Sequence, residues 1–251
     1  MSESPLKIIP TCHATPNVSC SQCRLASICL PISLHVEEID QVDSIIQRGR
    51  PLHKGDYLYR MEDEFHSVYA VRSGTIKTVA ITNSGQEQVT GFYLPGEILG
   101  LDGVGNGNHS NSAIALETSA VCEIPFNKME ELGKQVPNLN RHLFRLMGKE
   151  ITADQQLITL LSKNNAEERV ATLLLSISSR NGQRKLSLTS FRLPMSRADI
   201  GNYLGLTVET VSRTLSRFQK EGLIVADKKD IQIVDLNALR KIADISLFDV
   251  A

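Results

Sequence analysis

The segment RLPMSRADIGNYLGLTVETVSRTLSRFQKEGLIVADKKDIQIVD, residues 192–235, constrains the fold more than any other part of this chain. Ser196, followed three residues later by Asp199, has the layout of a capping box at the start of a helix. Gly205 ends this helix after about two turns, and Thr207 can cap the next one. Two helices joined by a glycine turn form a helix-turn-helix.

The apolar residues of these two helices have amphipathic spacing. Those expected to be buried are Ile200, Tyr203, Leu204, Val208, Val211, Leu215 and Phe218. Gly222 can close the second helix in the left-handed conformation. The strand-like runs LIVA and IQIV, joined by the turn DKKD, then predict a β wing.

The opposite face of the second helix carries Glu209, Ser212 and Arg213 in its N-terminal half. A recognition helix presents that half to base edges in the major groove of DNA. The Arg213 guanidinium can donate two hydrogen bonds to O6 and N7 of guanine. Glu209 can accept a hydrogen bond from the cytosine amino group, and Ser212 can bond to several bases. The candidate phosphate contacts are Arg197, Arg217 and Lys220. DNA is therefore the expected partner of this segment.

Residues 31–136 have the composition of a β domain, with turn residues between short β-forming segments. Ten of the 16 glycines lie between Gly49 and Gly107, among short segments rich in valine, isoleucine, tyrosine and threonine. Turn residues at KGD, RSG, NSGQ and LPGE separate these segments. Many short strands at this spacing predict a β-roll or jelly roll.

Residues 137–162 change to a helical period. The seam positions are Leu143, Met147, Ile151, Asp154, Ile158 and Leu161, with heptad spacing from Met147 onward. Such a seam fits a helix that pairs with its own copy, and equally a helix packed on its own domain. In a two-fold pair Asp154 would face its twin, so desolvation and repulsion would oppose association. We interpret Asp154 as a device that keeps a homodimer marginal.

The stretch CSQCRLASIC places Cys20, Cys23 and Cys29 in one short loop. No run of about 18 apolar residues is present, and the first residues lack the layout of a signal peptide. We therefore expect a cytoplasmic protein without a membrane partner, where structural disulfides are rare. Metal or cluster ligation is then the leading interpretation of the thiols, and their spacing is equally compatible with zinc and with an iron–sulfur cluster.

The distribution of charge also indicates an anionic partner. Residues 180–220 carry 8 basic and 2 acidic side chains, although the whole chain has a formal net charge of −1. Nothing in the sequence offers a substrate pocket with paired acid and base groups, and the six histidines show no ligand spacing. We therefore do not expect an enzyme.

Taken in order, these features resemble the cyclic-AMP receptor/FNR superfamily of bacterial transcription regulators, and within it the fumarate-and-nitrate-reduction (FNR) group. The motifs that carry the resemblance are CSQC-x5-C, GTIKT, TGFYLPGEILG, ALETSAVCEIPF, LLSKNNAEERVA and DIGNYLGLTVETVSR. The resemblance implies an α+β fold in four parts. These are a cluster ligand loop at 1–30, a cyclic-nucleotide-binding-like β-roll at 31–136, a dimerisation helix at 137–162 and a winged helix-turn-helix at 163–251.

The same resemblance implies a [4Fe–4S] cluster held by Cys20, Cys23, Cys29 and Cys122, with Cys12 left as a free thiol. It implies an oxygen sensor in which the cluster promotes dimerisation. The dimer would bind palindromic operators with TTGAT…ATCAA half-sites and act as an activator or repressor in the aerobic/anaerobic switch. The alternatives are a zinc-stabilised or cyclic-nucleotide-dependent regulator of the same superfamily, or an iron–sulfur enzyme.

Two further expectations concern ligands and partners. The resemblance implies contacts with RNA polymerase near Ser73 and Gly85 and on the loop 181–191. The segment YLPGEILG resembles the start of a phosphate-binding cassette, but the following LDGVGNGNHSNSAIAL contains no arginine. Without a cation an anionic phosphate would bind poorly, so no cyclic nucleotide is expected.

Overall fold

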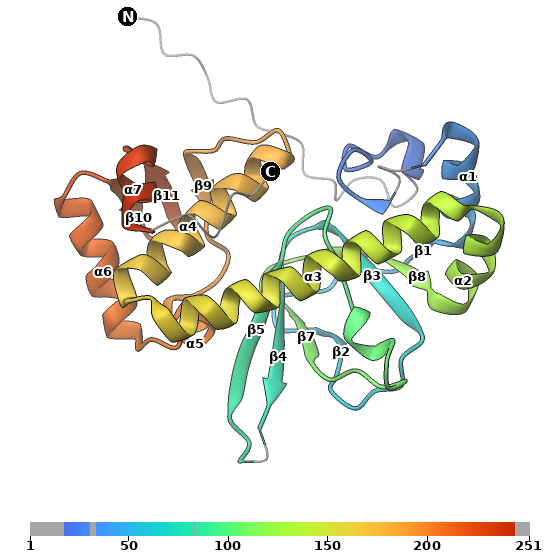
Figure 1. Ribbon diagram of the computed structural model, residues 1–251, viewed down its shortest axis with the longest axis horizontal. Coiled ribbons are helices and arrows are strands. Elements are labelled where there is room, and N and C mark those ends of the chain that lie inside the picture. Colours follow the sequence, from blue (N-terminus) through green and yellow to red (C-terminus); the bar gives the residue numbers. More distant parts are fainter. Residues whose placement is uncertain (1–17, 31–33, 83, 244–251) are drawn as a thin grey trace, which may run out of the picture.

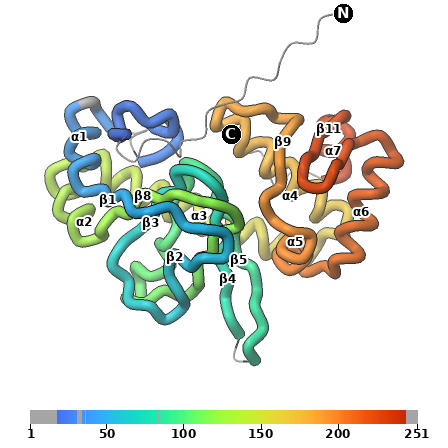
Figure 2. The backbone as a smooth tube through the Cα atoms, turned by 180° about the vertical axis from the view of Figure 1, so that it is seen from behind, coloured from blue at the N-terminus to red at the C-terminus, as the bar shows by residue number. Residues whose placement is uncertain are grey.

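The computed structural model describes residues 18–30, 34–82 and 84–243. A β-roll with helices at one end is joined by one long helix to a C-terminal winged helix-turn-helix (Figures 1 and 2). The predicted α+β fold class is thereby confirmed. No helix within these described ranges is long and apolar enough to cross a membrane.

The β-roll consists of two antiparallel four-stranded sheets. The first has the order β1-β8-β3-β6 and the second β2-β7-β4-β5. The strands of the first sheet are β1 (Gln47–Arg48), β3 (Ser67–Ser73), β6 (Ile98–Leu99) and β8 (Ala120–Pro125). Those of the second are β2 (Tyr57–Tyr59), β4 (Ile76–Ile81), β5 (Glu87–Tyr93) and β7 (Ser112–Ala115). Strand β5 therefore forms an edge.

Two helices that were not predicted close one end of the roll, α1 (Val36–Ile45) and α2 (Phe126–Gln135). The start of α1 is capped by Glu38, whose carboxylate accepts a hydrogen bond from the backbone N–H of His35 at 2.7 Å. The apolar residues at positions 36, 39, 42 and 45 have helical spacing, and this signal could have revealed α1. It was missed because turn residues dominate the region around it.

The long helix α3 (Pro137–Lys163) crosses the roll and leads to α4 (Ala166–Gln183) (Figure 1). Proline in the first turn suits a helix start because its missing N–H would have no partner there. At the junction, the Asn165 side chain caps α4 by accepting from the backbone N–H groups of Glu167 and Glu168 at 2.9 and 3.1 Å. The chain turns at this point from the long helix into the C-terminal head, residues 166–243.

The head has the predicted helix-turn-helix and wing. Its elements after α4 are β9 (Ser190–Arg192), α5 (Arg197–Leu204), α6 (Val208–Lys220), β10 (Ile224–Asp227), β11 (Asp230–Ile233) and α7 (Leu236–Ile242). The wing sheet has the order β10-β11-β9, so a third strand, which was not predicted, joins the hairpin.

Three apolar clusters hold these parts together. One joins the thiol loop (residues 18–30) to α1, the first sheet and the start of α3, through residues that include Leu30, Val42 and Leu139. A second fills the roll. The third contains Phe92 of β5 together with the core of the head, so roll and head share buried surface.

Candidate functional site

The turn between α5 and α6 is fixed by local hydrogen bonds and two glycines. The Ser196 hydroxyl accepts from the backbone N–H of Asp199 at 3.0 Å, and the Asp199 carboxylate accepts from the backbone N–H of Ser196 at 2.9 Å. Gly205 follows α5 with φ +63°, a conformation that glycine adopts most readily. A Cβ at Gly201 would lie 2.6 Å from the carbonyl oxygen of Leu206, so the turn can close in this way only over glycine.

Helix α6 buries one face against the head. Its N-cap, Thr207, accepts from the backbone N–H of Thr210 at 3.1 Å. The buried residues of α6 are Val211, Thr214, Leu215 and Phe218. The prediction that Val208 is buried is wrong, because this side chain lies in the exposed first turn and is 42% exposed.

The opposite face of α6 presents the residues predicted to read bases. Glu209, Ser212 and Arg213 are all exposed, as is Lys220 near the end of the helix. Arg213 lies 3.5 Å from the Thr210 hydroxyl, at the limit of a hydrogen bond, so its guanidinium can turn toward another acceptor. The face therefore offers both donors and acceptors to the major groove.

The two arginines predicted to contact phosphates have protein partners. Arg197 is partly buried and donates to the carbonyl oxygen of Lys228, in the wing turn, at 3.2 Å. Burial also lowers the pKa of its guanidinium. Arg217 is exposed and ion-paired with Glu167 and, at 2.8 Å, with Glu221. A phosphate would compete with these carboxylates for Arg217, whereas Arg197 already ties the reading unit to the wing.

The four cysteines predicted as ligands line one cavity of about 30 Å³. Three come from the thiol loop and Cys122 comes from β8, so segments distant in sequence meet here. The other lining residues are mostly apolar, but two arginines, Arg48 and Arg72, also face the cavity. All four thiols are free of disulfides. The remaining cysteine, Cys12, lies outside the described residues.

Burial and neighbouring charges set the protonation of these thiols. Desolvation raises the pKa of Cys29 to about 12, and it raises the pKa values of Cys20 and Cys122 as well. The Asp43 carboxylate accepts from the backbone N–H of Cys20 at 2.8 Å and is ion-paired with Arg48. The Arg48 Nη2 atom lies 3.9 Å from Cys20 Sγ, and Arg48 pairs directly with Cys122 in the β1–β8 register. A guanidinium is thus placed where thiolate charge would develop.

A site for a single metal ion requires its ligands to meet at one point, about 2.3 Å from each sulfur in the case of zinc. Among the described residues, no three Cys, His, Asp or Glu side chains are grouped in that way. The thiols are instead distributed over the lining of a shared cavity.

An apolar stripe runs along the exposed side of α3. Phe144, Ile151 and Ile158 are spaced by one heptad and are 71%, 58% and 67% exposed. Asp154 is exposed on the same side, and partial burial raises the pKa of its carboxyl group. We call this set of residues, with Met147 and Leu161, the α3 seam.

The α3 seam differs from the sequence prediction at one position. Leu143 packs against the core formed by the first sheet and α1, whereas Phe144 is the residue at the surface. The heptad template could have identified Phe144, because it precedes Ile151 by seven residues. Met147 and Leu161 are partly exposed along the same helix.

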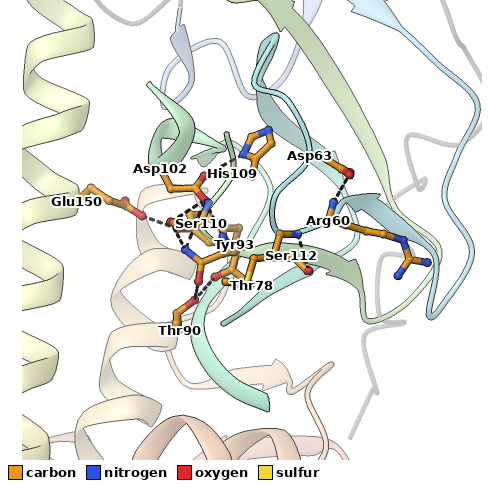
Figure 3. Close-up of polar contacts among 12 residues, drawn as sticks. Arg60, Asp63, Thr78, Thr90, Tyr93, Asp102, His109, Ser110, Ser112 and Glu150 are labelled. Atoms are coloured by element: carbon orange, nitrogen blue, oxygen red, sulfur yellow. Dashed lines mark hydrogen bonds and ion pairs between the residues drawn. The ribbon is translucent and has the colours of Figure 1, made fainter. Parts of the chain in front are cut away.

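Residues 101–116, which contain no arginine and were expected to lack a phosphate site, fold around the Asp102 carboxylate (Figure 3). Asp102 accepts from the backbone N–H groups of Ser110 and Asn111 at 2.9 and 3.0 Å. Its other oxygen lies 3.2 Å from Nδ1 of His109, a buried ring that stacks on Tyr59 with 3.7 Å between centroids. Aromatic rings and an acidic group thus fill this part of the roll.

A second carboxylate, that of Glu150, binds to the roll from α3. Glu150 accepts a hydrogen bond from the Tyr93 hydroxyl, which connects the long helix to β5 (Figure 3). Burial raises the pKa of Glu150, and the nearby Asp154 adds to the effect. The Asp102 carboxylate, whose pKa is lowered by its hydrogen bonds with His109 and with the backbone N–H of Asn111, is the acidic group here that would repel an anionic phosphate.

The residues expected to contact RNA polymerase lie in different environments. Gly85 is exposed at the tip of the β4–β5 hairpin, and the 181–191 segment carries exposed Leu186 and Leu188. Ser73 is only 6% exposed. Its hydroxyl is buried at the end of β3, and the contact with RNA polymerase near Ser73 stays a prediction.

Two family models match the chain, a cyclic nucleotide-binding domain over residues 49–135 and a Crp-like helix-turn-helix domain over residues 168–242. The transcriptional activator protein anr of Pseudomonas aeruginosa is 54% identical over 223 residues, which cover 89% of this chain and 91% of the relative. The fumarate and nitrate reduction regulatory protein of Escherichia coli is 50% identical over 226 residues, or 90% of each chain.

The likeness extends to solved structures. The structure of FixK2 from Bradyrhizobium japonicum matches with a TM-score of 0.73 and 28% sequence identity. The match covers 79% of this chain and 97% of that chain, so it includes both the roll and the head.

Proposed function

The chain belongs to the Crp/Fnr family of transcription regulators, and from that premise we propose that it is an oxygen sensor whose four thiols hold an oxygen-labile [4Fe–4S] cluster. Its relatives are transcription regulators, and it is accordingly a regulator and not an enzyme. The observation that carries the proposal is the single cavity lined by Cys20, Cys23, Cys29 and Cys122.

The residues around this cavity fit such a group. Four cysteine thiolates are the usual ligand set of a [4Fe–4S] cluster, and the apolar lining limits access of water. Arg48 and Arg72 offset the negative charge of a thiolate-bound centre. When bound, the cluster would supply an iron–sulfur centre that oxygen can oxidise. Asp43 holds the loop backbone at Cys20 and orients the Arg48 guanidinium.

The position of the thiol loop is coupled to what the cavity contains. The cavity is small, about 30 Å³, and three of its four thiols belong to the loop, so we propose that a bound cluster shifts the loop. The loop ends at Leu30, which is 1% exposed and packs in the same cluster as Val42 of α1 and Leu139 of α3. A displacement of the loop is therefore transmitted to the base of the long helix through close-packed side chains.

The α3 seam is the surface on which this displacement acts. In a homodimer, Ile151, Ile158 and Phe144 pack across the two-fold axis together with Met147 and Leu161, and they leave water on association. The twin Asp154 carboxylates oppose that association, so the apo protein dimerises weakly. The ligated loop favours the paired arrangement, and loss of ligation returns the protein to monomer.

Dimerisation places two heads on one palindromic operator with TTGAT…ATCAA half-sites. Arg213, Ser212 and Glu209 then contact bases in the major groove of each half-site. RNA polymerase would be reached through surfaces that are exposed here, near Gly85 and along 181–191. We do not propose a cyclic nucleotide as the effector, because the segment 101–116 contains no arginine and packs around the Asp102 carboxylate.

The proposal is tested by comparing anaerobic protein with the same sample after exposure to air. We expect a coloured, dimeric protein that binds a TTGAT…ATCAA duplex, and a bleached monomer with weak binding after aeration. Sedimentation velocity, visible absorbance and fluorescence anisotropy measure the three properties. Aerated protein that remains dimeric with full operator affinity would contradict oxygen control.

A further inference from the structure

Helix α5, the first helix of the helix-turn-helix, is docked on the edge of the β-roll. Strand β5 ends the sheet β2-β7-β4-β5, and α5 lies directly beside it (Figures 1 and 2). The Asn202 side chain accepts from the backbone N–H of Val89 at 2.5 Å and donates to the carbonyl oxygen of Glu87 at 2.7 Å. A neighbouring strand would exchange the same pair of bonds, so this amide takes the place of a strand partner.

Two further contacts surround the Asn202 amide. The ammonium group of Lys77, on β4, donates to the Asp199 carboxylate at 2.7 Å, and the two side chains are only 16% and 15% exposed. The ring of Tyr203 lies 5.0 Å from that of Phe92 between centroids. Helix α5 is therefore held to the β4–β5 hairpin by a strand-like amide bridge, a shielded ion pair and an aromatic contact.

The other end of α5 is fixed to the long helix by Arg169 of α4. Its guanidinium donates to the carbonyl oxygen of Leu204 at 2.9 Å and to that of Leu161 at 2.8 Å. The Nε–H group donates to the carbonyl oxygen of Asn164 at 2.9 Å. One side chain thus joins the C-terminal ends of α5 and α3, and the same helix α5 is tied to β5 through Asn202.

We propose that Asn202, together with the Lys77–Asp199 pair, is a positioning device that fixes the angle of the reading head relative to α3 and so sets the half-site spacing that the dimer accepts. The inference extends the proposed binding of a dimer to a two-half-site operator and rests on it. Glu209, Ser212 and Arg213 remain exposed while α5 is docked, so docking does not cover the face of α6 that is proposed to contact bases.

The physical reason lies in the geometry of a two-fold dimer. The separation of the two α6 helices depends on how each head is oriented on its long helix, and DNA half-sites recur with the helical repeat. A head held at one angle fits only one separation of the two half-sites. A head that can turn fits several separations, but each binding event then costs free energy to order it. Asn202 and Lys77 bind groups of β5 and α5 respectively, so they act through the orientation of α5.

The test uses full-length protein, prepared without air, and TTGAT…ATCAA duplexes whose spacer is the preferred length or is changed by one base pair. Asn202→Ala and Lys77→Met remove the two contacts, and Lys77→Arg keeps the ion pair. Gln86→Ala, at an exposed hairpin position, is the matched control. Anisotropy gives the affinity for each duplex, while sedimentation and visible absorbance report dimerisation and cluster content.

We expect Asn202→Ala to bind the preferred duplex about tenfold more weakly, with a smaller penalty for the altered spacers, at unchanged dimerisation and absorbance. Lys77→Met should also weaken binding to the preferred duplex and reduce the penalty for altered spacers, but by less. If Asn202→Ala does not fold, the result for Lys77→Met decides the test. Lys77→Arg and Gln86→Ala should resemble the wild type.

Two results would overturn the inference. One is an unchanged spacing profile in both deletion variants, and the other is tighter binding of Asn202→Ala to the preferred duplex, which would make the contact inhibitory. A wild-type protein without any spacing preference would instead contradict the proposed dimeric operator, and this inference with it.

Discussion

Three of the four thiols, Cys20, Cys29 and Cys122, lie in surroundings that favour their protonated form. Burial raises the pKa values of Cys20, Cys29 and Cys122, because a thiolate in a largely apolar cavity loses its hydration. Arg48 acts in the opposite direction on Cys20 and Cys122. The site therefore resists deprotonation when alone and has a cation in place for bound thiolates.

This balance predicts a pH dependence of loading. The pKa values of Cys20 and Cys29 are raised above the ordinary thiol value of about 9, so these thiols carry protons throughout the neutral range. They must release those protons to bind iron. Apparent affinity should increase by up to about tenfold per pH unit for each proton released, between about pH 6.5 and 8.5. Anaerobic titration with ferrous iron and sulfide, followed by absorbance, measures the effect, and a flat profile would show that the thiols are already ionised.

The sequence could identify some of these residues but not their assembly. The spacing of Cys20, Cys23 and Cys29 indicated a ligand loop, since three thiols so close together have few other uses in a reducing compartment. Nothing in that spacing identified Cys122, which joins the cavity only through the pairing of β8 with β1 and β3. Asp43 and Arg48 were missed for the same reason.

Among the elements, the helix-turn-helix was predictable because local signals agree. Its cap, glycine turn and apolar stripe all lie within one short segment, so little tertiary information was needed. Helices α1 and α2 and strand β9 are short, and packing on the rest of the fold decides their conformation. Helix α1 has helical apolar spacing, but no glycine turn and adjoining helix accompany it, as they do for α6.

The glycine turn makes a specific prediction about stability. In Gly201→Ala the new methyl group would approach the Leu206 carbonyl oxygen to 2.6 Å, so the α5–α6 turn must open or shift. We expect a loss of about 1–3 kcal/mol in the free energy of unfolding, as in overpacked sites. Gln219→Ala, at an exposed site of α6, should change it by less than about 0.5 kcal/mol. Urea denaturation of both variants decides the matter, and equal stabilities would contradict this view of the turn.

The α3 seam makes a prediction about association. Asp154→Ala removes a like charge from a helix face that otherwise presents Ile151 and Ile158. Dimerisation of the cluster-free protein should strengthen by at least about 1 kcal/mol, or about fivefold in the dimer constant. Asp154→Asn, which keeps the size and removes the charge, should act in the same direction. Sedimentation equilibrium that finds an unchanged constant in both variants would exclude Asp154 from the interface.

At the scale of the whole molecule, the parts form a continuous chain of contacts. The thiol loop packs with α1 and the base of α3, Glu150 joins α3 to β5, and β5 holds the head through Asn202. The order of the parts could be predicted from the sequence, because each part has its own spacing of apolar residues and its own turn residues. The docking of the head on an edge strand did not, because Lys77 and Asn202 are separated by more than 100 residues and carry no local signal.

The central claim is that the four thiols bind an iron–sulfur cluster, and the most direct measurement is the metal and acid-labile sulfide content of protein purified without air. We predict about four irons and four sulfides per chain, which fall together in Cys122→Ser and are retained in Cys12→Ser. Stoichiometric zinc with neither iron nor sulfide would contradict the account.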